Sequence, residues 1–87
     1  MNKTEFTQKI KDIMKTRGDL VWKIAKARQK STKSKYLLKF LWYTTKFINL
    51  LSIWKDLKLI KNEIANREIA KAINDNRETY NQLLLLK

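Results

Sequence analysis

The chain has almost none of the residues that interrupt a helix. It contains no proline and a single glycine, Gly18, in 87 residues. Because tight turns between strands depend on glycine and proline, this distribution disfavours a strand-rich fold and favours helices. We therefore predict an all-α protein, and a chain of this length forms one small helical domain over residues 1–87.

The first third of the chain has the spacing of an amphipathic helix. Its side chains at three- and four-residue intervals form one stripe that is apolar except for an arginine, and lysines occupy the positions around it. This pattern predicts a helix over about residues 4–28 with a basic outer face. The members of the stripe are Phe6, Ile10, Ile13, Met14, Arg17, Val21, Ile24 and Ala25.

The central stretch YLLKFLWYTTKFINLLSIW, residues 36–54, predicts a second helix. Projected at 100° per residue, five of its six aromatic side chains fall on one side and Trp42 lies on a flank, whereas Thr45, Asn49, Ser52 and Asp56 form a narrow polar strip on the other side. The polar segment 29–35 before it is predicted to be a loop in which a serine or threonine caps the helix. We expect the second helix to span about residues 35–64.

The last third continues as helix but with a different apolar face. Its apolar positions Ile69, Ile73, Tyr80 and Leu84 are rotated by roughly 150° from those of the central stretch. Either the helix breaks near Asn66 and a third one spans 66–85, or the two are continuous and face different neighbours. The architecture is therefore a helical hairpin or a three-helix bundle.

Charge is the strongest functional signal. The formal net charge is +12, and residues 1–35 alone hold eleven basic and three acidic side chains. A surplus of this size attracts nucleic acid, anionic lipid or an acidic protein surface. The residues expected to contact an anionic partner are Lys23, Lys26, Arg28, Lys30, Lys33 and Lys35.

The residue inventory argues against catalysis. The chain has no cysteine and no histidine, so it lacks thiolate and imidazole zinc ligands and the common nucleophile–base pairs. Its eight carboxylates are scattered among lysines and are typical of solvated helix surfaces. We expect a protein that is not an enzyme and that carries no metal or cofactor.

The aromatic stripe of the central stretch has three interpretations. Its 19 residues match the ~30 Å of a bilayer core, but Lys46 near the middle would cost about 2.5 to 3.5 kcal/mol. The same helix could lie in the membrane interface, or the stripe could be the core of the protein's own bundle. The residues expected to contact a partner or lipid are Tyr36, Phe40, Tyr43, Phe47 and Trp54.

From these features we expect a small cationic binding protein, acting as an accessory, inhibitory or immunity-type partner of a protein complex at or in a membrane. The alternative is a nucleic-acid-binding protein that uses the basic patch of the first helix and the 29–35 segment. Self-association is a further alternative, because one small core cannot easily bury all the apolar helix faces. The N-terminal residues lack the apolar stretch of a cleavable signal peptide, so we expect an intracellular location.

Overall fold

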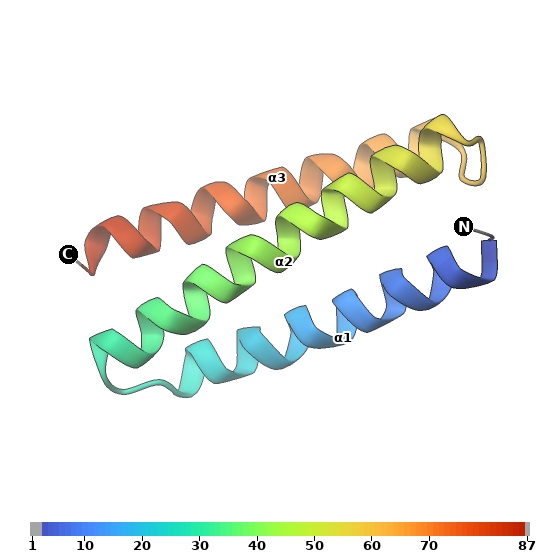
Figure 1. Ribbon diagram of the computed structural model, residues 1–87. Helices are drawn as coiled ribbons and strands as arrows, with labels where there is room; N and C mark the ends of the chain where they lie inside the picture. The colour runs from blue at the N-terminus through green and yellow to red at the C-terminus, as the bar shows by residue number, and fades with distance from the viewer. Residues whose placement is uncertain (1–2, 87) are drawn as a thin grey trace.

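The computed structural model describes residues 3–86 and consists of three antiparallel helices (Figure 1). They are α1 Lys3–Lys26, α2 Lys30–Asp56 and α3 Asn62–Leu85. The all-α prediction is confirmed. Helix α2 packs against both α1 and α3 and runs between them, so it supplies most of the shared core.

The inner face of α2 has the alternating three- and four-residue spacing of a coiled-coil seam. Five of its six seam residues are buried and the sixth, Trp54, is half-buried. Such spacing keeps one stripe of a helix against its neighbours along its whole length. The seam residues of α2 are Leu37, Phe40, Thr44, Phe47, Leu51 and Trp54.

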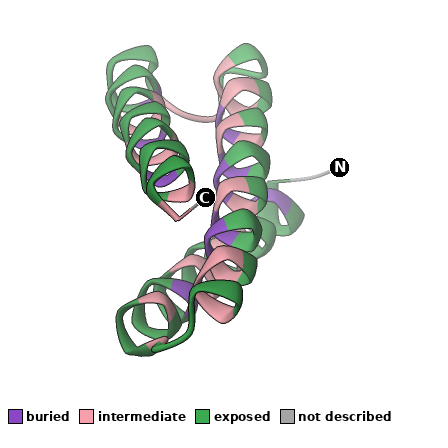
Figure 2. Cartoon of the chain, turned by 90° about the vertical axis from the view of Figure 1, so that its left-hand side faces the viewer, coloured by how far each residue is buried: buried purple, intermediate pink, exposed green. Residues whose placement is uncertain are grey.

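The facing helices have matching seams but different side-chain sizes. In α1 the seam contains the large apolar residues Phe6, Ile10 and Leu20, which are buried. In α3 the buried positions are Ala65, Ala72 and Thr79, spaced by seven residues, and these small side chains let α3 lie close to α2. Figure 2 shows the consequence, since buried segments face the neighbouring helix and exposed ones face outward.

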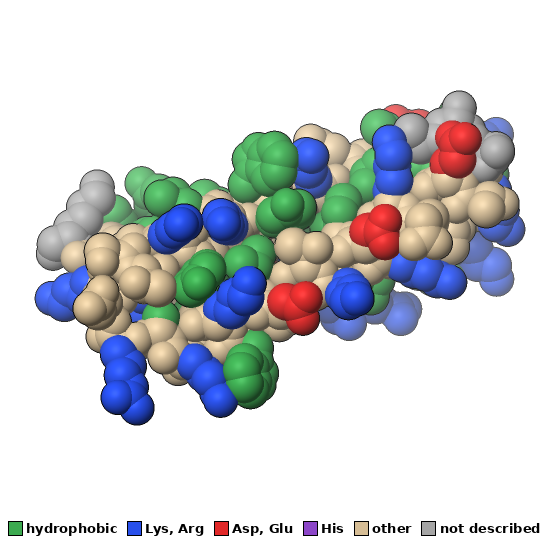
Figure 3. Space-filling view, turned by 60° about the horizontal axis from the view of Figure 1, so that its bottom comes forward, with side chains coloured by type: hydrophobic (Ala, Val, Ile, Leu, Met, Phe, Trp, Pro, Cys, Tyr) green, Lys and Arg blue, Asp and Glu red, His purple; other side chains and the backbone are tan. Residues whose placement is uncertain are grey.

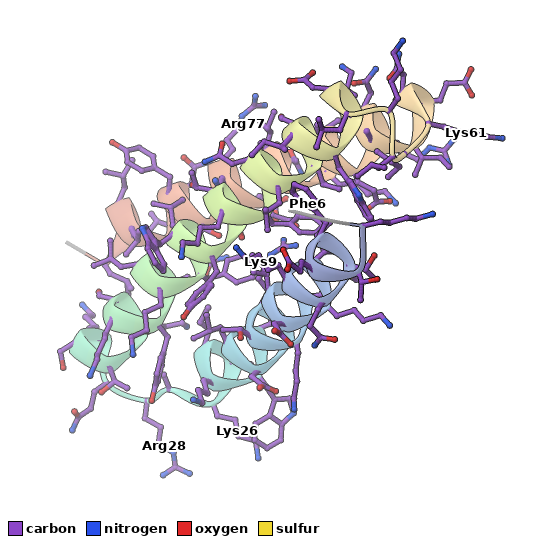
Figure 4. All side chains as sticks on the ribbon, turned by 45° about the vertical axis from the view of Figure 1, so that its right-hand side comes forward. Phe6, Lys9, Lys26, Arg28, Lys61 and Arg77 are labelled. Atoms are coloured by element: carbon purple, nitrogen blue, oxygen red, sulfur yellow. The ribbon has the colours of Figure 1, made fainter. Side chains whose placement is uncertain are left out.

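The largest apolar cluster lies toward the end of the molecule that carries the α2–α3 connection. Ile10, Phe47, Leu51 and Ala72 form its buried centre. Near the same end, the rings of Phe6 and Trp54 stack with centroids 6.5 Å apart, and Phe6 lies between α1 and α2 (Figure 4). The cluster therefore joins residues of all three helices.

Halfway along the bundle the core contains a polar layer centred on Arg17. Its Nε donates to Thr44 Oγ1 of α2 at 3.0 Å, and its Nη2 lies 2.9 Å from Asp75 Oδ2 of α3. The guanidinium also lies over the rings of Phe40 and Phe47, 5.2 and 5.0 Å from their centroids. One side chain of the predicted stripe thus bonds to both other helices.

The first connection is shorter than predicted. Helix α1 ends at Lys26 rather than near residue 28, and α2 begins at Lys30, so the predicted loop 29–35 is almost entirely helical. Gln29, with extended backbone angles, occupies the N-cap without a side-chain hydrogen bond, and the predicted capping serines and threonine lie inside the helix. The segment is polar because α2 begins to bury side chains only at Leu37.

The second break lies earlier than predicted. Helix α2 ends at Asp56, α3 begins at Asn62, and the helices are not continuous. Lys58 adopts a φ of 59°, and the Leu59 and Lys58 amides donate to the Trp54 and Lys55 carbonyls. This is the Schellman pattern, which closes a helix with a left-handed residue. The expected break near Asn66 is wrong because Asn66 lies within α3, where its Oδ1 accepts from Lys55 Nζ.

Candidate functional site

The six basic residues expected to contact an anionic partner lie together at one end of the molecule. Lys23 and Lys26 are in the last turn of α1, Arg28 is in the connection, and the others are in the first turns of α2. Figure 4 shows Lys26 and Arg28 extending away from the helices. We call this region the basic end, and its residues are Lys23, Lys26, Arg28, Lys30, Lys33 and Lys35.

The basic end has no ion-paired counter-charge within residues 3–86, and its nearest acidic neighbour in the first helix is Asp19, which lines the same hollow as Lys23. None of its six side chains forms an ion pair with another described residue, and residues 20–55 contain nine basic and no acidic side chains. In the space-filling view (Figure 3) acidic side chains occupy the middle and the opposite end of the visible face. Lys30 and Lys33 also stand at the positive end of the α2 dipole, where a bound anion would relieve repulsion.

The aromatic residues expected to contact a partner have divided roles. Phe40 and Phe47 are buried, so the stripe serves in part as the core of the bundle, which was one of its three interpretations. Tyr36, Tyr43 and Trp54 are half-buried. Contact of these three with a partner stays a prediction, and Phe40 and Phe47 are accessible to one only if the helices separate.

Two exposed tryptophans are the features that sequence reasoning missed. Trp22 and Trp42 have 63% and 55% of their surface exposed. The Lys26 Nζ lies 3.8 Å from the Trp22 ring centroid, and the Lys46 Nζ lies 4.0 Å from that of Trp42. In each pair the lysine follows the tryptophan by four residues on a helix, a spacing that is visible in the sequence.

These tryptophans line different hollows in the surface of α1 and α2, and the two hollows share Lys23. Three shallow hollows lie along these helices, the first beside Trp42, the second beside Lys46 and the third beside Trp22. Tyr43 lines the first two hollows, and Lys23 lines the first and the third. The surface combines cations, aromatic rings and aliphatic side chains such as Leu38 and Leu50, with Asp12 and Asp19 as its acidic members. We call it the Trp–Lys face, defined by Trp22, Lys23, Lys26, Tyr36, Lys39, Trp42, Tyr43 and Lys46.

Residues 3–86 contain neither a candidate metal site nor a candidate membrane span. No group of three or more histidine, cysteine, aspartate or glutamate side chains in this part of the chain could hold a metal ion. No helix there has both the length and the apolar character that crossing a bilayer requires. What the described chain does present is a surface for non-covalent contact.

Comparison of the chain with protein-family models, with curated proteins and with solved structures found no match in any of the three.

Proposed function

We propose that this protein is a non-enzymatic binding protein that associates with an anionic membrane surface through the Trp–Lys face. There it would act as an accessory, inhibitory or immunity-type partner of a membrane-bound protein complex. One observation carries the proposal: Trp22 and Trp42 are both exposed, and each has a lysine ammonium over its ring.

The pairing of tryptophan and lysine suits the headgroup region of a bilayer. Indole rings settle at the boundary between acyl chains and water, and lysine stems lie along apolar surface while their ammonium groups stay hydrated. Each lysine near an anionic surface contributes about 1 kcal/mol of attraction. The neighbouring basic end would add its own charge to the same contact.

Two details favour lipid over single-stranded nucleic acid. Bases stack on open aromatic faces, whereas Lys26 and Lys46 already cover faces of the Trp22 and Trp42 rings. Leu38 is an exposed aliphatic residue beside Trp42, and aliphatic side chains gain from acyl chains but not from phosphates. Nucleic-acid binding through the basic end is the second candidate, supported by the absence of ion pairs to its side chains among the described residues.

Vesicle partitioning tests the proposal. The protein should bind vesicles that contain phosphatidylglycerol more tightly than pure phosphatidylcholine vesicles, with a blue shift of tryptophan emission and with weaker binding at higher salt. The Trp22→Ser/Trp42→Ser variant should bind at least about tenfold more weakly, since removing about 1.4 kcal/mol of transfer free energy has that effect.

Met14→Ser is the matched control, because Met14 is equally exposed but lines the α1–α3 side of the molecule. It should leave vesicle binding within about twofold of the unmodified chain. Salt-sensitive retention on DNA or RNA with no uptake by anionic vesicles would contradict the membrane proposal and favour the second candidate.

A further inference from the structure

Helix α3 carries a second seam that the described residues leave exposed. Besides its inner seam against α2, it has residues spaced by four, three, four, three and four positions along its outer side, all of them exposed. The apolar members Ile73, Tyr80 and Leu84 are 47%, 56% and 45% exposed. This outer seam consists of Asn66, Ala70, Ile73, Arg77, Tyr80 and Leu84.

The outer seam lies on the side of α3 that faces away from α1. The α3 residues that line the hollows beside α1 are Asp75, Glu78, Thr79 and Gln82, and at 100° per residue the outer seam points away from them. On the opposite flank Asn76 Nδ2 donates to Thr45 Oγ1 of α2 at 3.3 Å. The seam and the Trp–Lys face therefore involve different surfaces, and the inference does not depend on membrane binding.

Charge singles out this surface in a strongly basic chain. Helix α3 has three basic and four acidic residues, a net charge of −1, whereas α1 carries seven and three (+4) and α2 six and one (+5). The outer seam itself holds one charge, Arg77. The neighbouring strip of α2 is uncharged from Thr45 through Asn49 to Ser52, and charge reaches the seam from α2 near its end, where Lys55 Nζ donates to Asn66 Oδ1. Two copies of the chain would repel each other least if they met here.

We infer that α3 pairs in antiparallel orientation with α3 of a second copy. The two-fold axis crosses the helix pair at the level of residue 75, on the side of α3 opposite to the Asp75 side chain. This pairing is a self-complementary interface of the kind that two-fold symmetry requires. Each residue n then lies opposite residue 150 − n of the second copy. Ile73 therefore meets Arg77 of the second copy, and Ala70 meets its Tyr80. Small side chains lie opposite large ones, and the two Arg77 side chains do not meet each other.

Self-association should respond to salt in the opposite sense to vesicle binding. Each copy carries +12, so screening lowers the long-range repulsion between copies and leaves the apolar contact in place. Sedimentation velocity over about 10 µM to about 1 mM protein, a range that covers contacts of modest affinity, should show a monomer–dimer equilibrium that shifts toward dimer as salt rises. A monomer at every concentration and salt level would overturn the inference.

Substitutions locate the interface. Ile73→Glu and Tyr80→Glu should each weaken dimerisation at least about tenfold, because a charge would be buried at the seam. Met14→Glu changes the net charge equally at an exposed position of α1 and should leave the dimer unchanged. Retained helical circular dichroism and unfolding midpoints show that the variants fold. A dimer insensitive to both seam substitutions would overturn the placement.

Spin labels test the orientation, and the absence of cysteine makes single labelling sites simple to introduce. Antiparallel pairing separates the two Asn62→Cys sites by about 39 Å along the axis and brings the two Asn74→Cys sites within about 3 Å along it, at 1.5 Å per residue. Electron–electron distance measurements should therefore give a long distance for the first and a short one for the second. Equal, short distances for both would indicate a parallel pair and contradict the antiparallel arrangement.

Discussion

Arg17 is the residue on which the register of the three helices depends most directly. It occupies a core position of α1, and its side chain is only 15% exposed, while that of Asp75 is 44% exposed. A polar group in an otherwise apolar seam fixes which layers can face each other, because any shift leaves it without partners. Thr44, fully buried beside it, accepts one of its hydrogen bonds.

Removing the carboxylate of this pair should be costly. Asp75→Asn leaves the largely buried Arg17 guanidinium without its counter-charge, and we expect a loss of about 1 to 3 kcal/mol in the free energy of unfolding. Glu78→Gln, at an exposed site one turn away on α3, should change it by no more than about 0.5 kcal/mol. Urea unfolding followed by far-UV circular dichroism gives both values, and equal effects would contradict the assigned role of Asp75.

Single residues also show the limit of pattern reasoning. Arg17 was placed in the first stripe by its spacing, but nothing in the sequence links it to Asp75, 58 positions away. Likewise, Trp22 and Trp42 have the same spacing to a following lysine as many surface pairs, and their exposure depends on which face of each helix meets its neighbours. The residue types and spacings at these positions could be read from the sequence, but the residues that they contact in the fold could not.

At the level of elements, α2 ends in a Schellman motif whose left-handed position is occupied by a lysine rather than by the glycine that this conformation favours. Lys58 holds the left-handed position of the Schellman motif, where a side chain other than glycine's costs on the order of 1 kcal/mol. Lys58→Gly should therefore raise the free energy of unfolding by about 0.5 to 1 kcal/mol.

Lys58→Ala is the informative control, because alanine removes the same charge and keeps the steric cost. It should give little or no gain by thermal or chemical unfolding. If alanine stabilised the protein as much as glycine, relief of charge repulsion rather than backbone conformation would explain the effect.

The helices themselves were predictable, but their ends were not. Three- and four-residue periodicity located all three helices, because that property is local. In α3 it marked the wrong face as the one in contact, since Ile73, Tyr80 and Leu84 are exposed. The buried positions of α3 are Ala65, Ala72 and Thr79. The segment 29–35 was misjudged because polar residues begin a helix as readily as they form a loop. The segment 57–61 between α2 and α3 contains neither glycine nor proline, so no helix-breaking residue predicts a break there. We attribute the position of the break to the packing of α3 on α2.

At the level of the whole molecule, stability is distributed unevenly along the bundle. The buried centre of Ile10, Phe47, Leu51 and Ala72 lies toward the α2–α3 connection, whereas the opposite end is the basic end. There, lysines follow the uncapped start of α2 and add like charge to its positive dipole end. We expect local opening to occur there first.

Native-state hydrogen exchange measures this difference. Amides of residues 47–51 should exchange at least about tenfold more slowly than those of residues 34–38 in the same helix, because opening near the core costs more free energy. Raising the salt concentration should narrow the gap by screening the lysines. Uniform protection along α2 would instead show that the helix opens as one unit.

The sequence alone determined that this chain is helical, basic and without cysteine or histidine, because these properties follow from residue types and from periodicity within one segment. Only the tertiary structure decided that Phe40 and Phe47 belong to the core and that Arg17 joins Asp75. The same holds for Trp22 and Trp42, which form an exposed face with their lysines, and for the uncovered outer seam of α3. Those outcomes depend on which face of each amphipathic helix packs against a neighbouring helix. Contacts between residues far apart in the chain determine that choice.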